Sequence, residues 1–350
     1  MRTPAAERRQ QIVTVVRDQG VIRLADLAAR LNVSPVTVRR DVEALAQQGL
    51  LHRTHGAVRP AAAAGAAAAP DRPATAVLGM LVPDAAYYFA DIIRGARAAA
   101  AEAGARLVLG ISGYRPEEDR AQLDRLAESG ADALLLSPSW PDGHPTAAES
   151  DQLRRLTTPA VLVERRAAPG TPVADLDRVS SDHTHGCFLA VRHLAALGHD
   201  RIRLVARADS PTATAVRAGF AAAAKALDLP AQEPLSGGPG ELERAADQLA
   251  AAVTAGETQA VLVHNDIDAI ALVQRLHTHG VRVPDDLALI AYDDEMAALA
   301  DTPLTAVAPP KRAVGETAVR LALRRVGATS DPGTHVELLP QLRVRESCGA

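Results

Sequence analysis

Residues 24–57 have the sequence LADLAARLNVSPVTVRRDVEALAQQGLLHRTHGA and carry the clearest local signals in the chain. Apolar residues recur three and four positions apart over 24–31, as on one face of a short helix. After a turn, Ser34 suits the N-cap of a second helix, and Pro35 suits its first position. Gly49 is a typical C-terminal stop. The stretch therefore predicts two helices joined by a tight turn.

The second of these helices has one face suited to a core and another suited to DNA. A wheel at about 100° per residue places Val38, Val42 and Leu45 together as an apolar stripe. A polar face with arginine in the first two turns suits a major groove, and the N-terminal amides suit phosphate. The alternative is an arginine pair that only solvates a surface helix, but the cap, the turn and the stripe favour DNA contact. The polar face carries Thr37, Arg39 and Arg40.

Residues 50–56 predict a small hairpin that offers Arg53 and His55 to the DNA backbone or the minor groove. The charge of this region agrees with such a role. Residues 1–60 contain ten Arg and five acidic residues, a net charge of 10 − 5 = +5. The whole chain carries −4, so the remainder carries −4 − 5 = −9. A basic head on an acidic body favours a polyanion-binding module attached to a part that does not bind polyanions.

The segments DLA..L.VS..TVRRD, L...G.L and R.HG resemble the winged helix-turn-helix of the DeoR family. The single Gly56 is a departure, because that family usually has a glycine pair before Ala. This departure lies in the predicted wing, the same segment that carries Arg53 and His55. The resemblance implies that the recognition helix approaches DNA with Ser34, Pro35, Thr37, Arg39 and Arg40.

Composition divides the chain into a head, a linker and a body. Residues 59–76, RPAAAAGAAAAPDRPATA, have no hydrophobic period and contain three prolines that interrupt helices. We expect a winged helix-turn-helix domain over 1–58, an Ala/Pro-rich linker over 59–74, and an effector-binding and dimerisation domain over 75–346.

The overall composition is that of an ordinary soluble protein, with 350 residues, 47% hydrophobic and 23% charged. The two cysteines, Cys187 and Cys348, have neither a disulfide framework nor a metal-ligand spacing. No apolar run approaches the ~18 residues that span a bilayer, and the N-terminus lacks the apolar region of a secretion signal. We expect a cytoplasmic protein with no membrane partner, no metal and no cofactor.

The body predicts an α/β fold of parallel sheets covered by helices on both faces. Continuous apolar strands alternate with helical stretches such as Phe89–Ala103 and Asp182–Leu197, which is typical of doubly wound sheets. About 270 residues are long for one such sheet and suit two lobes. The predicted strands are Thr75–Leu81, Arg106–Gly110, Ala133–Leu136, Ala160–Val163, Ile202–Ala206, Ala260–Val263 and Leu287–Ala291.

Polar residues follow several of these strands, where open α/β sheets bind ligands. Glu164 and Arg165 follow one strand, Asn265 another, and Asp293 a third. Paired carboxylate, amide and guanidinium groups suit a polyhydroxylated ligand, because each sugar hydroxyl both donates and accepts. Each residue alone also fits a cap or loop role. For Tyr88 and Phe89 core packing is as good an interpretation as ligand contact, and Asp266 and Asp294 are expected to be caps or solvated neighbours.

Segments across about residues 75–346 resemble the effector domain of LacI-type regulators and their sugar-binding relatives. They include AVLGMLVPD, GADALLLSP, PAVLVERR, HLAALGHDRI, NDIDAIALVQRL and LALIAYDD. There are three departures: the loop at residues 83–87 is one residue short and lacks the common Asn-Pro, Glu164 stands where Asp is usual, and Pro309 stands where Gln is common. The ligand contacts that the resemblance implies are Tyr88, Phe89, Glu164, Arg165, Arg217, Asn265 and Asp293.

The resemblance also implies how the two lobes exchange strands. We expect one lobe from about 75–178 plus 309–330 and the other from about 182–306 plus 334–346. Three crossovers between them would form a hinge.

The sequence thus predicts a ligand-responsive transcriptional regulator, a repressor that binds operator DNA as a homodimer or tetramer and responds to a sugar or a similar polyhydroxylated small molecule. The alternatives are an activator, or a sugar-binding protein without a regulatory role. An enzyme is disfavoured, since the sequence has no G-x-S-x-G, phosphate loop or metal cluster.

Overall fold

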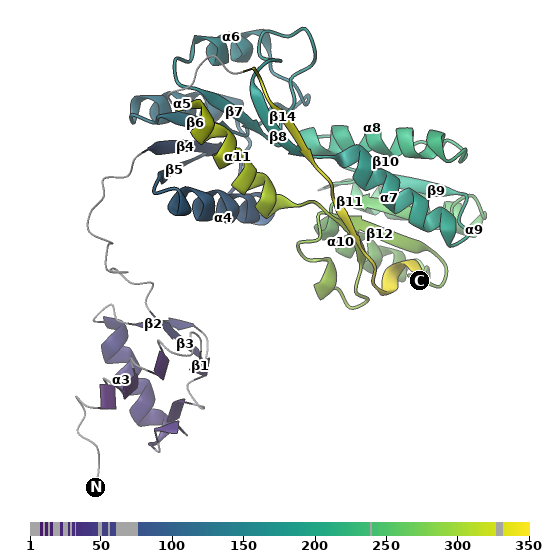
Figure 1. Cartoon of the computed structure of the whole chain (residues 1–350). Coiled ribbons are helices and arrows are strands. Elements are labelled where there is room, and N and C mark those ends of the chain that lie inside the picture. The colour runs from purple at the N-terminus through teal and green to yellow at the C-terminus, as the bar shows by residue number, and fades with distance from the viewer. Residues whose placement is uncertain are drawn as a thin grey trace. The chain divides into compact units, whose positions relative to one another are not determined.

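The computed structural model of the chain describes residues 8–9, 11–12, 15–16, 22–23, 27–28, 30–31, 33–47, 51–54, 57–60, 76–238, 240–326 and 332–350. It divides into two compact units, Met1–Pro73 and Ala74–Ala350. We call them the head and the body and describe each by itself (Figure 1).

The head is built around α3, Pro35–Gln47. The amide of Thr37 donates to Ser34 Oγ at 3.2 Å, which confirms the N-cap. Val38, Val42 and Leu45 are buried with Ile12, so the predicted apolar stripe faces the core. The head also contains a three-stranded antiparallel sheet in the order β1-β3-β2. Its strands are β1 Ile22–Arg23, β2 Leu51–Thr54 and β3 Ala57–Pro60.

A buried carboxylate ties the first helical residues of the head to α3. Asp41 is 3% exposed and pairs with Arg8 at 2.6 Å and with Arg9 at 3.0 Å. Burial raises the pKa of Asp41, but the bonds from the two arginines outweigh that effect and lower it.

The first lobe of the body is a six-stranded parallel sheet in the order β14-β8-β7-β6-β4-β5. Helices α4 and α11 pack on one face, and α5 and α6 on the other. The elements of this lobe are β4 Val77–Val82, α4 Tyr87–Glu102, β5 Arg106–Ile111, α5 Pro116–Glu128, β6 Ala133–Leu136, α6 Ala147–Arg155, β7 Ala160–Val163, β8 Asp177–Ser181, α11 Lys311–Arg325 and β14 His335–Leu338.

The second lobe is a six-stranded sheet in the order β10-β9-β11-β12-β13-β15, with only β15 antiparallel to its neighbour. Helices α9 and α10 pack on one face, and α7 and α8 on the other. The elements are α7 His183–Ala196, β9 Ile202–Ala206, α8 Pro211–Ala226, β10 Leu235–Ser236, α9 Leu242–Thr254, β11 Ala260–His264, α10 Asp266–Thr278, β12 Ala288–Tyr292, η1 Ala297–Leu299, β13 Thr305–Ala308, β15 Gln341–Arg343 and η2 Glu346–Cys348. No helix among these described elements is long and apolar enough to cross a membrane.

The chain crosses between the lobes three times, as the sequence predicted (Figure 1). The crossings lie between β8 and α7, between β13 and α11, and between β14 and β15. The predicted bounds were partly wrong. β14 pairs with β8 in the first lobe, so residues 335–338 do not belong to the second lobe, and the last crossing falls at Leu339 and Pro340.

Candidate functional site

A cavity of about 390 Å³, here called the first cavity, lies where the carboxyl ends of strands from both lobes face each other. Such strand ends are where open α/β sheets bind ligands. The first lobe contributes Asp84, Tyr87, Tyr88, Phe89, Tyr114 and Arg165, and the second contributes Arg207, Asp209, Ser210, Pro211, Thr212, His264, Asn265, Ile267 and Asp293.

Asp293 is the most perturbed acid in the first cavity. It directly follows β12, is 3% exposed, and has a left-handed backbone with φ 90°. A non-glycine residue in that region costs about 1–3 kcal/mol, and such outliers cluster at binding sites. Burial raises the pKa of its carboxyl to about 7, although the nearby Lys311 opposes the change. Oδ1 is buried with no hydrogen-bond partner among the described residues, so it is available to a ligand.

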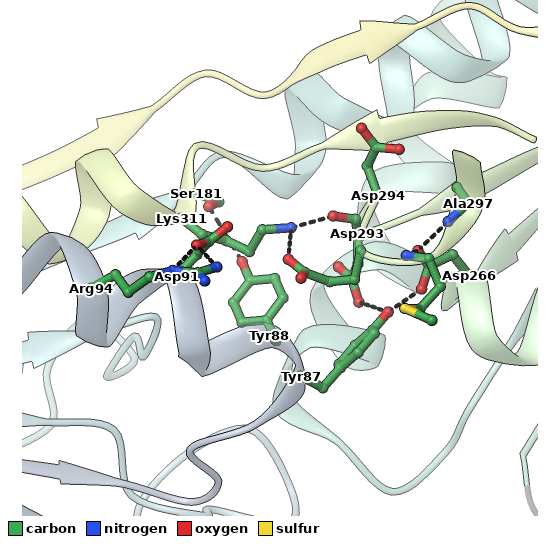
Figure 2. Close-up of polar contacts among 12 residues, drawn as sticks. Tyr87, Tyr88, Asp91, Arg94, Ser181, Asp266, Asp293, Asp294, Ala297 and Lys311 are labelled. Carbon is green, nitrogen blue, oxygen red and sulfur yellow. Dashed lines mark hydrogen bonds and ion pairs between the residues drawn. The ribbon is translucent and has the colours of Figure 1, made fainter. Parts of the chain in front are cut away.

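A tyrosine from the first lobe bonds to two acids of the second. The Tyr87 hydroxyl donates to Asp266 Oδ1 and lies 3.4 Å from Asp293 Oδ2 (Figure 2). Asp266 is fully buried and also accepts from the amides of Met296 at 2.5 Å and Ala297 at 3.0 Å. It is therefore a buried acid that joins the lobes and accepts from the amides at the start of η1. Of the two predicted interpretations, a cap or a solvated neighbour, the solvated neighbour is wrong.

The other acid named beside it, Asp294, lies 2.7 Å from Arg345 in an ion pair. Its side chain is 14% exposed, so it is held by a partner rather than solvated. This pair ties the loop after β12 to the C-terminal segment that follows β15.

Lys311 makes a second contact across the lobes. It begins α11, is 6% exposed, and donates to the backbone oxygen of Asp293 (Figure 2). Its Nζ lies 2.5 Å from Glu295 Oε1 and 5.4 Å from the centre of the Tyr88 ring. The loop after β12 is thus held from the first lobe by both Tyr87 and Lys311.

Tyr88 and Glu164 form a buried pair beside the first cavity. The Tyr88 hydroxyl donates to Glu164 Oε1 at 3.1 Å, and Ser181 donates to the same carboxylate from its amide at 3.1 Å and its hydroxyl at 2.8 Å. Burial alone would raise the pKa of Glu164, but interactions with His183 and hydrogen bonds from Ser181 outweigh that effect, so the pKa of this carboxyl is lowered from its usual value. Glu164 lines an adjoining cavity, whereas Tyr88 and Phe89, packed edge-on at 5.6 Å, line the first.

The remaining predicted ligand residues separate into two groups. Arg165 and Asn265 line the first cavity, and Asn265 also caps α10 by accepting from the Asp268 amide at 3.2 Å. Arg217 is not among its lining residues. Its guanidinium donates to the carbonyl oxygens of Ala206 and Arg207 at the end of β9.

Among the polar lining residues that were missed, two end a strand or directly follow one. His264 ends β11, and burial lowers its pKa to about 3, with His183 and Arg207 acting in the same direction. Both of its ring nitrogens are buried and lack hydrogen-bond partners among the described residues. Arg207 follows β9 and pairs with Asp209 through two bonds of 2.9 Å. The strand-end rule that indicated Asn265 could have found both.

Three residues of the predicted DNA interface have described side chains. Ser34 and Arg40 are exposed and Thr37 is half-buried. Arg40 is thus exposed on the side of α3 that faces away from the core stripe of Val38, Val42 and Leu45. The side chains of Pro35, Arg39 and Arg53, and the whole of His55, lie outside the described residues.

Two family models match the chain. Residues 8–62 match a DeoR-like helix-turn-helix domain, and residues 191–348 match a periplasmic binding protein-like domain. The HTH-type transcriptional repressor PurR of Vibrio parahaemolyticus is 29% identical over 280 residues, which cover 78% of this chain and 81% of the relative.

Solved structures of similar fold cover the body. One is a LacI family transcriptional regulator from Enterococcus faecium with bound ribose, with a TM-score of 0.62, 24% identity, and coverage of 77% of this chain and 98% of that chain. Another is the lac repressor dimer bound to operator and the anti-inducer ONPF, with a TM-score of 0.65, 22% identity, and coverage of 78% and 94%.

A helix-turn-helix head joined to a two-lobed body with a polar cavity between the lobes defines a ligand-responsive transcriptional regulator. More particularly, this chain joins a head that matches a DeoR-like helix-turn-helix domain to a body that matches a periplasmic binding protein-like domain over residues 191–348 and has a fold similar to that of LacI-type regulators, the two resemblances that its sequence predicted.

Proposed function

We propose that this protein is a repressor that holds an operator until a sugar occupies the first cavity. One observation supports a sugar as the class of effector. The cavity combines guanidinium, carboxylate, amide and imidazole groups with aromatic rings, and three of its buried polar atoms have no hydrogen-bond partner within the described part of the chain, namely Asp293 Oδ1 and both ring nitrogens of His264. An unpaired buried polar atom is costly, and sugar hydroxyls can both donate to and accept from such atoms. The ribose bound to the Enterococcus faecium regulator is consistent with this class.

In this proposal the head and the body have separate roles. Residues 1–58 would bind DNA through Ser34, Pro35, Thr37, Arg39 and Arg40 and through the wing residues Arg53 and His55. Residues 59–74 would link this domain to the body, residues 75–346. The body would dimerise and bind the sugar through Tyr88, Phe89, Arg165, Asn265 and Asp293, with Glu164 and Arg217 positioning these contacts. The operator-bound lac repressor dimer and the repressor PurR support this assignment.

The test uses the full chain. An operator is first selected from a random DNA library, and operator affinity is then measured by fluorescence anisotropy with and without a panel of monosaccharides and disaccharides. We expect at least one sugar to weaken operator binding and to raise the melting temperature, since a ligand that binds only the folded state stabilises it.

Two variants locate the response. Asp293→Ala should bind the operator normally but no longer respond to the sugar, whereas Asp151→Ala, on the exposed surface of α6, should respond like the parent. A sugar that tightens operator binding would make the protein an activator or co-repressor-dependent repressor. If no sugar changes either the operator affinity or the melting temperature, the proposed effector class is wrong.

A further inference from the structure

A second cavity of about 490 Å³ adjoins the first and shares Arg165, Pro211 and Thr212 with it. Its first-lobe wall is the segment after β7 together with β8, and its second-lobe wall is the start of α8. Because three residues line both cavities, one ligand can reach from one into the other.

Three guanidinium groups line this second cavity. Arg165 is 3% exposed, and the hydrogen bonds that it donates go to the carbonyl oxygens of Pro138 and Glu164. No carboxylate of the described residues lies within ion-pair distance of it. A buried cation that lacks a paired anion is costly, which favours a bound anion nearby.

The other two guanidiniums share a single carboxylate oxygen. Arg166 and Arg178 lie 3.1 Å and 3.5 Å from Glu337 Oε1. Burial lowers the pKa of Arg178, and repulsion from Arg166 lowers it further, so one acid does not balance the two cations.

Two buried atoms on this wall have no hydrogen-bond partner among the described residues, Arg178 Nε and Ser180 Oγ. Ser180 is only 2% exposed. The two residues lie two positions apart on β8 and so face the same side of the sheet. In the pairing of β8 with β14, Ser180 lies opposite Glu337, which explains how that acid reaches Arg178. A guanidinium can only donate, so the group that completes this wall must accept.

The remaining charged groups of the second cavity do not supply that acceptor. Glu164 already accepts from Tyr88 and Ser181, and Asp142 is exposed at the rim. His144 and His183 also line this cavity, and neither side chain is an anion.

We propose that the effector is an anionic sugar whose carboxylate or phosphate binds Arg165, Arg178 and Ser180 in the second cavity while its hydroxyls occupy the first. Guanidinium groups form strong, bidentate hydrogen bonds with both kinds of anion. The inference rests on the proposed function, because it extends the same effector site.

The test compares matched ligands on the full chain by calorimetry. Glucose, glucuronate and glucose 6-phosphate form one series, and ribose and ribose 5-phosphate form another. In at least one series we expect the anionic member to bind about tenfold tighter or more than its neutral parent. The uronate and the phosphate arms distinguish a carboxylate from a phosphate.

Three variants test the assignment of residues. Arg178→Gln and Ser180→Ala should each weaken binding of the anionic sugar, by about tenfold for the arginine, and leave the neutral parent unchanged. Arg154→Gln, an exposed arginine of α6 in the same lobe, is the control and should change neither. Circular dichroism confirms folding, and Ser180→Ala keeps the test decisive if the arginine variant does not fold.

Millimolar inorganic phosphate is an independent probe. Compared with chloride at equal ionic strength, it should raise the melting temperature of the parent but not that of Arg178→Gln. If a neutral sugar binds as tightly as its anionic partners and Arg178→Gln changes nothing, the anion site is wrong while the proposed function stands. If no sugar of either charge binds or changes operator affinity, the proposed function itself fails.

Discussion

At the scale of single residues, Asp293 couples the effector cavity to pH. Burial raises its pKa from an unfolded value near 3.8 to about 7. Between these two values the folded protein keeps the proton that the unfolded chain releases, so stability falls as the pH rises toward 7. Above pH 7 the carboxylate is ionised in both states, and the full cost of burying its charge remains.

We therefore expect Asp293→Asn, without ligand, to be more stable than the parent at pH 8, by on the order of a few kcal/mol. The advantage should shrink as the pH falls from 7 toward 4, because the parent carboxyl becomes neutral as well. Melting temperatures across this pH range measure the effect, and Asp151→Asn, an exposed acid of α6, is the control. A constant difference between variant and parent at every pH would contradict the assignment.

Arg40 is exposed on α3, so its substitution should weaken operator binding. A good side-chain contact with a base edge contributes about 1–3 kcal/mol, so Arg40→Ala should weaken operator binding by that amount with an intact fold. Affinity for unrelated DNA at the same salt concentration should change much less. Equal losses on both DNAs would assign Arg40 to the phosphate backbone instead.

The sequence predicted part of the site at this scale. The rule that ligands meet the carboxyl ends of strands located Arg165, Asn265 and Asp293, since it needs only the order of strands and loops. The bond between Tyr87 and Asp266 joins residues 179 positions apart, and it depends on how two lobes face each other. No local pattern contains that information.

At the scale of elements, α4 and α11 pack with their backbones in close contact. A Cβ on Gly95 would overlap the carbonyl oxygen of Arg312, and one on Gly315 would overlap that of Ile92. The two glycines therefore set the distance between the helices. That distance also positions Lys311, which begins α11 and reaches the loop after β12.

Gly95→Ala or Gly315→Ala should each destabilise the body by about 3 kcal/mol, because the backbones must separate. The better helix propensity of alanine returns only about 1 kcal/mol, so the clash prevails. Urea unfolding measures this difference, and Ala98→Ser, on the exposed face of α4, should have little effect. Stabilisation by either alanine would show that the helices can move apart freely.

Elements with continuous apolar runs were predicted well, and polar elements were not. Ala133–Leu136 and Ala160–Val163 have the bounds that the sequence predicted. β8 was missed because its sequence, DRVSS, has one apolar residue, and it is a strand through pairing on both sides with β7 and β14. β15 is only three residues long, and it is a strand because it pairs with β13 in an antiparallel ladder.

At the scale of the whole body, the contacts of Tyr87 and Lys311 join the lobes in this structure. Hydrogen bonds to charged groups contribute about 1.5–3 kcal/mol, so Tyr87→Phe should favour a more open arrangement by a similar amount. Fluorescent labels on Asp151→Cys and Arg244→Cys, one exposed site per lobe, can report the separation, since both native cysteines are buried. We expect a longer distance in the variant without ligand, and an unchanged distance would show that the bond does not hold the lobes together.

The three crossings have a consequence for how genes can recombine. Each lobe is assembled from separate stretches of chain, so no single cut yields either one intact. The residues that match the DeoR-like domain are one uninterrupted stretch, 8–62, and can be exchanged in one step. A new DNA specificity can therefore be acquired by one exchange of coding sequence, whereas half of the effector pocket cannot be replaced in that way.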